Sequence, residues 1–177
     1  MSRSSRRPHR FLSAARALVA AAVLALAPAP RVHADQHGRT VGPSGLPLPR
    51  FVSLASERVN MRTGPGKEFP VRWVYVRAGL PVKIVAEADV WRKIIDPDGE
   101  TGWVHSALLS GRRTVVVRGG ILALKRRPDP EALTLARVEP GVIAELQTCR
   151  AAWCLVEVAD LRGWLPRARL WGVDPAR

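Results

Sequence analysis

The stretch "VRAGLPVKIVAEADVWRKIIDPDGETGWVHSALLSG", residues 76–111, contains short apolar, β-branched runs separated by turn residues. "PVKIVAE" leads through "ADV" to "WRKIID", and "PDGE" then precedes "TGWV". Runs of this length, bounded by Asp-Gly and similar pairs, predict antiparallel strands joined by hairpins. No part of the stretch has the period of an amphipathic helix, and "HSALL" suits a single 3₁₀ turn. The stretch therefore predicts a β-meander.

The same pattern returns in residues 138–172, "VEPGVIAELQTCRAAWCLVEVADLRGWLPRARLWG". Each copy has a glycine before an apolar run, a tryptophan twelve residues later, and a Gly-Trp pair before the final turn. The corresponding residues are 62, 62 and 61 positions apart: Gly79 and Gly141, Trp91 and Trp153, Trp103 and Trp164. Chance rarely keeps so many landmarks in register, so we interpret the chain as a tandem repeat.

A unit of about sixty residues with five or so short strands closes most economically as a small β-barrel. We therefore predict an all-β protein with two tandem barrels, over residues 51–113 and 114–177. The recurring tryptophans are expected to pack the core or rim of each barrel: Trp91, Trp103, Trp153 and Trp164. The run "SGRRTVVV" joins the copies without a flexible spacer, which predicts one rigid tandem unit.

These features resemble the bacterial SH3-like domain. "VNMRTGPGKEFPV", residues 59–71, looks like the opening motif of that family, and "TGWVHSALL", residues 101–109, looks like its closing motif. The whole arrangement is similar to exported bacterial proteins with tandem SH3-like domains, a family of largely undefined function. The resemblance covers residues 51–173 and implies two SH3-like barrels, the second of them degenerate and carrying the "C…WC" pattern.

The first 34 residues have the pattern of a secretory signal peptide. A basic start precedes the apolar run "ALVAAAVLALA", and small residues follow it, with cleavage expected after Ala34. The apolar run is too short for a membrane span, which needs about 20 residues. We expect a secreted or periplasmic protein on the Sec route, with Tat export as the alternative because of the paired Arg6 and Arg7. Residues 35–50 are rich in Gly and Pro and predict a flexible linker.

Removal of the leader would lower the net charge from +13 to +7, by almost half. The full chain has 28 basic and 15 acidic residues; six arginines and no acids lie in the leader, which leaves 22 basic and 15 acidic residues, net +7. The remaining charge favours acidic partners such as wall polymers. Together with export, it argues against nucleic acid as the partner. No stretch after the leader is long and apolar enough for a membrane span, so we predict none after cleavage.

The opening motif contains the turn Gly64-Pro65-Gly66. We expect both glycines to supply backbone angles that other residues resist, and Pro65 to fix its own φ between them. The second copy has "LKRRPDP" there and lacks both glycines, with Leu124 aligned to Met61. We therefore expect the copies to share a barrel skeleton but not this loop, so that a family-like groove belongs to the first copy.

Cys149 and Cys154 flank "RAAW" in an expected hairpin, where facing residues lie close enough for a disulfide. In an exported chain with two cysteines, a local disulfide is the main prediction, worth about 2 kcal/mol to the second domain. A redox-active pair is the alternative; the C-x₄-C spacing and the lack of a thioredoxin-like βαβ pattern stand against it.

No set of residues in the sequence predicts catalysis, a cofactor or a metal site. His105 is the one histidine inside a predicted domain, and a turn or capping role explains it. Asp96 and Asp98 in "DPDGE" predict turn chemistry. Neither a phosphate-binding glycine loop nor a Gly-x-Ser-x-Gly elbow occurs. We expect a protein that is not an enzyme and needs neither cofactor nor metal.

Comparison of the copies singles out aromatic residues for ligand binding. Trp73 aligns with Leu135, and Tyr75 aligns with Arg137. Because Tyr75 is aromatic in one copy and charged in the other, we expect it to be exposed. Core or rim packing is the favoured interpretation for Trp73. Our hypothesis is a groove for an extended peptide, lined by Arg62, Lys67, Trp73 and Tyr75.

These observations predict a non-catalytic binding module. The resemblance implies the ligand class, a peptidoglycan stem peptide or a segment of another envelope protein. The alternative is a structural or assembly factor of the envelope that acts through protein–protein contacts without a groove ligand. Nucleic-acid binding is open to small barrels in general, but it does not fit an exported protein.

Overall fold

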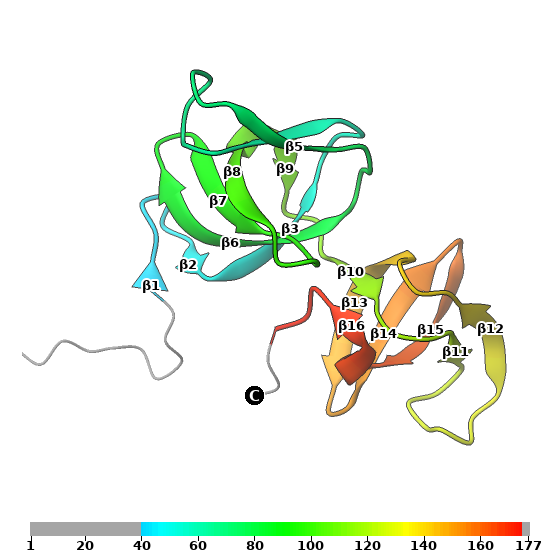
Figure 1. Ribbon diagram of the computed structural model, residues 1–177. Coiled ribbons are helices and arrows are strands. Elements are labelled where there is room, and N and C mark those ends of the chain that lie inside the picture. The colour runs from blue at the N-terminus through cyan, green and yellow to red at the C-terminus, as the bar shows by residue number, and fades with distance from the viewer. Residues whose placement is uncertain (1–39, 175–177) are drawn as a thin grey trace, which may run out of the picture. The chain divides into compact units, whose positions relative to one another are not determined.

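The computed structural model describes residues 40–174, which lie in one compact unit. Across these residues the chain forms sixteen strands and two 3₁₀ helices (Figure 1). None of the helices in this part of the chain is long and apolar enough to cross a membrane. The predicted signal peptide lies outside the described residues, as do residues 35–39 of the predicted linker.

The first barrel is an antiparallel sheet of seven strands in the order β5-β4-β8-β7-β6-β3-β9. A 3₁₀ helix, η1 (Ser106–Leu108), precedes its last strand, and the Nδ1 atom of His105 accepts a hydrogen bond from the Ala107 N–H at 3.2 Å. This confirms the capping role predicted for His105. The strands are β3 (Arg50–Leu54), β4 (Val59–Arg62), β5 (Val71–Tyr75), β6 (Pro81–Ala88), β7 (Trp91–Ile95), β8 (Thr101–His105) and β9 (Leu109–Ser110).

The second barrel repeats this architecture in the order β12-β11-β15-β14-β13-β10-β16. Its 3₁₀ helix, η2 (Arg167–Arg169), precedes the last strand as η1 does. β6 and β13 carry bulges at matching places, between Ile84 and Ala86 and between Leu146 and Thr148. The prediction of two tandem small barrels is confirmed. The strands are β10 (Thr114–Val117), β11 (Leu122–Lys125), β12 (Thr134–Val138), β13 (Ile143–Arg150), β14 (Trp153–Val158), β15 (Leu161–Pro166) and β16 (Leu170–Trp171).

Each barrel closes on its own apolar core, and the recurring tryptophans lie outside both cores. The first core contains Met61 and Val104, and the second contains Leu124 and Leu165. Successive residues of a strand face opposite sides, so Trp103, next to the inward Val104, faces outward. The recurring tryptophans were predicted to pack in the core or at the rim of each barrel, and they lie at the rim. The four half-buried tryptophans are Trp91, Trp103, Trp153 and Trp164.

Residues 40–50 are part of the first barrel's surface, which corrects the prediction of a flexible linker there. β1 (Thr40–Val41) pairs with β2 (Pro47–Leu48), and the Leu48 side chain is buried in the first core. Gly42 allows a close approach, because a Cβ atom there would lie 2.6 Å from Glu87 Oε2. The Gly- and Pro-rich composition predicted a linker, because composition does not show that Leu48 is buried and that Gly42 is packed against Glu87.

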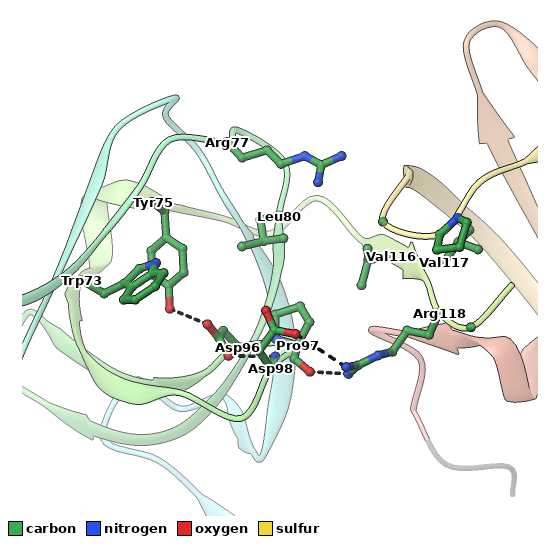
Figure 2. A pocket seen from close by; sticks show the side chains of 13 residues that line it. Trp73, Tyr75, Arg77, Leu80, Asp96, Pro97, Asp98, Val116, Val117 and Arg118 are labelled. Atoms are coloured by element: carbon green, nitrogen blue, oxygen red, sulfur yellow. Dashed lines mark hydrogen bonds and ion pairs between the residues drawn. The ribbon is translucent and has the colours of Figure 1, made fainter.

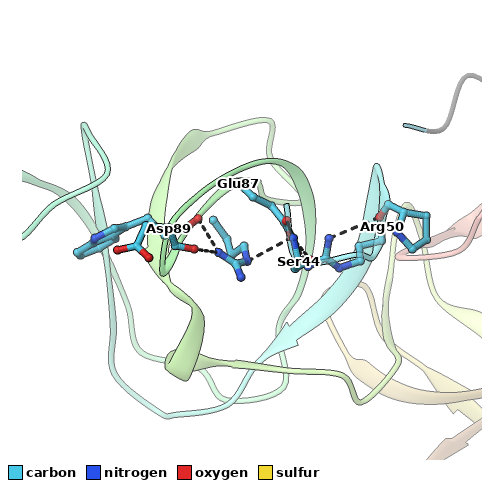
Figure 3. A network of polar contacts seen from close by, with 7 residues as sticks. Ser44, Arg50, Glu87 and Asp89 are labelled. Carbon is cyan, nitrogen blue, oxygen red and sulfur yellow. Dashed lines mark hydrogen bonds and ion pairs between the residues drawn. The ribbon is translucent and has the colours of Figure 1, made fainter. Parts of the chain in front are cut away.

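A buried carboxylate holds this hairpin in place (Figure 3). The side chain of Glu87 is 1% exposed, and its Oε1 atom accepts hydrogen bonds from Ser44 Oγ at 2.8 Å and Arg50 Nη2 at 2.7 Å. Its Oε2 atom accepts from the Ser44 N–H at 2.9 Å. Burial alone would raise the pKa of Glu87, but the hydrogen bonds from Ser44 and the charge of Arg50 lower it to about 2.

The two barrels link β6 to β7 and β13 to β14 at the same place by different chemistry. In the first barrel Glu87 faces Arg92, whose Nε lies 3.3 Å from Glu87 Oε1. In the second barrel Cys149 faces Cys154 at the corresponding register position, and the two form a disulfide. The predicted disulfide is confirmed.

Specific contacts also join residues of the two barrels. The Thr114 hydroxyl donates a hydrogen bond to the carbonyl oxygen of Gly79 at 2.7 Å. The ring of Phe51 meets Trp171 edge-on, with centroids 5.1 Å apart. Such an aromatic pair contributes about 0.5–1.5 kcal/mol beyond the area it buries.

Candidate functional site

A groove of about 420 Å³ lies beside the end of β5 (Figure 2). Trp73, Tyr75 and Arg77 come from β5 and the residues just after it. The second barrel contributes residues on both sides of two turns, among them Arg118 and Gly141. Both barrels therefore build this groove, whereas the sequence assigned any groove to the first copy alone.

Trp73 is the most prominent apolar side chain of the groove. It is 52% exposed although it lies opposite Met61, a core residue, in the β4–β5 pairing. β5 is the edge strand of the sheet, so Trp73 has a neighbouring strand on one side only. Trp73 does not pack in the core, which corrects that part of the favoured interpretation; at the rim its side chain offers an open aromatic face.

Tyr75 is buried, which corrects the prediction that it is exposed. It is 5% exposed, and its hydroxyl donates to Asp96 Oδ2 at 3.0 Å and lies 3.4 Å from Met61 Sδ. Burial raises the pKa of Tyr75, and the negative charge of Asp96 raises it further. Tyr75 thus forms part of the groove's supporting wall.

The strand register explains why the prediction for Tyr75 failed. Val59 pairs with Tyr75 in the first barrel, and Leu122 pairs with Val138 in the second. Tyr75 therefore corresponds to the buried Val138, not to Arg137. The first barrel has one more residue between this strand and the next glycine, and alignment on the glycines moved the match by one position.

Asp96 organises the turn beneath the groove. Its side chain is buried, and Oδ1 accepts hydrogen bonds from the Asp98 N–H at 2.9 Å and the Glu100 N–H at 2.8 Å. Gly99 adopts a φ of +90° in the same turn. The turn chemistry predicted for "DPDGE" is confirmed for Asp96, and the carboxylate also fixes Tyr75.

The other two residues of the hypothesised site do not line the groove. Arg62 Nη1 donates to the carbonyl oxygen of Phe69 at 2.7 Å, so this guanidinium braces the loop between β4 and β5. Lys67 is exposed on that loop. The structure thus brings Trp73 and Tyr75 together along the groove and leaves Arg62 and Lys67 outside its lining.

The Gly64-Pro65-Gly66 turn needs its first glycine for space rather than for backbone angle. Neither glycine has a positive φ, which corrects the prediction. A Cβ atom on Gly64 would lie 2.3 Å from Cδ1 of Phe69, so the aromatic ring occupies the room that a side chain needs. A glycine is required here by close packing.

The corresponding loop of the second barrel has the same backbone geometry without glycines, which corrects the expectation that the loops differ. Thr63 N donates to the Pro70 carbonyl, and Arg126 N donates to the Leu133 carbonyl. The equivalent of Phe69 is Ala132, which is small and buried. Without the ring there is space for a side chain at the position equivalent to Gly64, which is Arg127, and the loop keeps its path.

Sequence comparison missed Arg77, Asp98 and Arg118 as groove residues. Arg118 Nη1 donates to the carbonyl oxygen of Pro97, and its Nη2 atom lies 3.6 Å from Asp98 Oδ1. Within residues 40–174 the guanidinium of Arg77 makes no hydrogen bond or ion pair. Arg77 lies in the loop that differs in length between the copies, so the alignment carried no signal for it.

The groove combines groups suited to non-covalent binding. Trp73 and Leu80 offer apolar surface, and Arg77 and Arg118 offer guanidinium donors. The arrangement suits an extended, amphipathic ligand.

Three solved structures are similar to this chain at low identity. They are NlpC2 from Trichomonas vaginalis (12% identity, TM-score 0.32, covering 72% of this chain and 51% of that one), an NlpC/P60 family protein from Bacillus cereus (13%, 0.32, 68% and 55%) and NlpC1 from Trichomonas vaginalis (11%, 0.32, 69% and 45%). The chain spans about half the length of each. At this sequence identity and TM-score, the similarity gives no evidence about function. Comparison with curated proteins finds no match.

The family comparison agrees with the two barrels. The model of the bacterial SH3 domain matches residues 55–111 and 119–172, one match in each barrel and together more than half of the chain. Both matched ranges contain the meander and the Gly-Trp pair that recur in the sequence. Two barrels with one strand order and one family match each make this chain a member of the bacterial SH3 domain family.

Proposed function

We propose that the protein is a non-catalytic binding module that holds an extended peptide in the groove beside β5. Bacterial SH3 domains are binding modules that are often associated with the cell wall. The observation that carries the proposal is Trp73, a large aromatic side chain left half exposed at the mouth of a groove. A half-exposed indole supplies a large, rigid apolar face that a ligand can bury.

The edge position of β5 supports a peptide over other ligands. β5 pairs only with β4 among the described strands, so one side of its backbone keeps free N–H and C=O groups. An extended peptide can pair with such an edge and place its side chains in the groove alongside. The ligand would be a stem peptide of the cell wall or a segment of another envelope protein.

An extracytoplasmic location fits the chemistry of the second barrel. The Cys149–Cys154 disulfide persists where the surroundings are oxidising, as in the periplasm or outside the cell. Peptides of the envelope are the ligands present in that compartment. The signal peptide expected in residues 1–34 would deliver the protein there.

Co-sedimentation with purified cell-wall sacculi tests this function. We expect the wild-type chain to sediment with sacculi or to be captured by envelope protein, and Trp73→Ala to lose most of this binding. Val41→Ala is the matched control, because Val41 is 74% exposed and does not line the groove. Sacculi incubated with the protein should release no peptide fragments. Binding that is unchanged in Trp73→Ala would point to the assembly-factor alternative.

A further inference from the structure

The groove-facing residues of β5 and of the segment just after it are spaced as in an extended strand. Trp73, Tyr75 and Arg77 are spaced two residues apart and all line the groove. In Figure 2 the Arg77 guanidinium lies away from Trp73, toward the second barrel, with Leu80 between Arg77 and the Asp98–Arg118 pair. A ligand strand beside β5 would therefore meet an aromatic face at one end and a guanidinium at the other.

The charges of the groove leave Arg77 without a counter-ion. Asp96 is buried, and its two oxygens already accept hydrogen bonds from Tyr75 and from two backbone N–H groups. Asp98 lies beside Arg118, at 3.6 Å. Within residues 40–174 Arg77 makes neither hydrogen bond nor ion pair, so its donors are available to a ligand.

We infer that the ligand adds as a strand to the open edge of β5, with an apolar side chain on Trp73 and a carboxylate on Arg77. This inference rests on the proposed function and specifies its ligand. Positions 73 and 77 are four residues apart, about 13 Å along a strand. The ligand would thus carry its apolar residue and its carboxylate four positions apart, and the carboxylate could belong to an acidic side chain or to the chain end.

The second barrel acts as the opposite wall of the same groove. Arg118 reaches the Pro97–Asp98 turn of the first barrel, and Gly141 lines the groove from the following turn. The position of Trp73 is occupied by Ala136 in the second barrel, as the pairing of Met61 with Trp73 and of Leu124 with Ala136 shows. The second copy therefore lacks the aromatic face and serves the first copy's site.

Four synthetic peptides test the inference by NMR titration of the ¹⁵N-labelled protein. The first is acetyl-Phe-Thr-Ala-Thr-Asp-amide, and the second replaces its Asp by Asn. The third moves the acid one position inward (acetyl-Phe-Thr-Ala-Asp-Thr-amide). The fourth is acetyl-Phe-Thr-Ala-Thr-Ala with a free carboxyl terminus. The readouts are the Trp73 indole N–H, the β5 amides and the dissociation constant.

We expect the Asp peptide to shift the Trp73 and β5 signals and to bind about threefold to tenfold more tightly than the Asn peptide. The acid one position inward should give little gain, because successive residues of a strand face opposite sides. If only the fourth peptide binds more tightly than the Asn peptide, the carboxylate that Arg77 recognises is the carboxyl terminus of the ligand. Arg77→Gln should abolish the preference for acid, whereas Arg137→Gln, an exposed arginine outside the groove lining, should preserve it.

Two results would overturn the inference in different ways. Equal binding of the Asp and Asn peptides, with Trp73 still shifted, would reject the carboxylate contact and leave peptide binding in the groove intact. If none of the peptides shifts β5 or Trp73, strand addition is rejected. The sacculus and envelope assay with Trp73→Ala then decides the proposed function independently.

Discussion

At the scale of single residues, the opening loop of the first barrel depends on the pair Gly64 and Phe69. The Phe69 ring fills the space beside Gly64, whereas the second barrel has a side chain at that glycine position and a small Ala132 in place of the ring. One barrel has a small residue at the first position and a large one at the second, and the other barrel has the reverse. The total side-chain volume at the two positions is therefore similar in both barrels.

We expect Gly64→Ala to destabilise the protein by about 1–3 kcal/mol, because the new methyl group would overlap the Phe69 ring. The double variant Gly64→Ala/Phe69→Ala should recover part of this loss. Urea unfolding measures both free energies. Gly111→Ala is the control, since no atom lies within 4 Å of a Cβ there. If Gly64→Ala lowers the free energy of unfolding equally in the wild type and in a Phe69→Ala background, the overlap with the ring is not the cause of the destabilisation.

The packing of residues 40–50 on the first barrel depends on a second residue, Glu87, which accepts hydrogen bonds from Ser44 and Arg50. Its pKa of about 2 in the folded protein is below the ordinary value of 4.5, so the ionised form is favoured by folding. The resulting stability is present above pH 4.5 and is lost as the pH falls toward 2. Glu87→Gln should cost about 1–3 kcal/mol at neutral pH, because Ser44 and Arg50 lose a charged, buried acceptor.

Urea unfolding at pH values from 2 to 7 tests the role of Glu87, across the range that its pKa shift sets. We expect the wild type to lose more stability on acidification than Glu87→Gln does. Hydrogen exchange at Ser44 should speed up in the variant, because the Ser44 N–H loses its carboxylate acceptor. Glu57→Gln, at an exposed position, is the control. Parallel acid profiles for wild type and Glu87→Gln would contradict the account.

At the scale of elements, the hairpins β6–β7 and β13–β14 show how the copies diverged on one frame. Both have a bulge at the same place and a cross-strand link next to the turn. The link is the Glu87–Arg92 ion pair in the first copy and the Cys149–Cys154 disulfide in the second. In the first copy the acidic partner also holds the N-terminal hairpin, a contact that a disulfide there would remove.

We expect the double variant Cys149→Ser/Cys154→Ser to destabilise the second barrel by about 2 kcal/mol, as the closure of a short loop predicts. Guanidinium unfolding with and without reductant measures the effect on the wild type. The double variant itself should not respond to reductant. A reductant effect of the same size in the variant would show that the disulfide is not its source.

The elements also show what the sequence could and could not predict. The meanders, the 3₁₀ turns and the disulfide follow from short-range patterns, because turn residues and alternation act locally. The exposure of Trp73 and the burial of Tyr75 were missed because the loop after β5 is one residue longer in the first copy than in the second. Alignment of the copies on their glycines therefore matched each residue of β5 to the wrong residue of β12. The structured hairpin of residues 40–48 depends on long-range contacts of Leu48 and Glu87.

At the scale of the whole molecule, the contacts between the barrels are expected to couple their unfolding. The Phe51–Trp171 ring pair and the Thr114–Gly79 hydrogen bond join residues of the two barrels. Urea unfolding of residues 35–177 should therefore give one transition with coincident probes, and limited proteolysis should not release two folded halves. Trp171→Ala should separate the transitions. Two transitions already present in the wild type would contradict this coupling.

Site-specific photo-crosslinking in the cell envelope tests the central claim, peptide recognition in the groove beside β5, most directly. Pro140→p-benzoylphenylalanine places the probe at an exposed position that lines the groove and makes none of the proposed ligand contacts. Val41→p-benzoylphenylalanine places it at a 74% exposed site on the N-terminal hairpin, outside the groove lining. We predict an adduct with an envelope peptide at position 140 that disappears in Trp73→Ala and does not form at position 41. Equal adducts at both positions, or an adduct at position 140 that survives Trp73→Ala, would contradict the account.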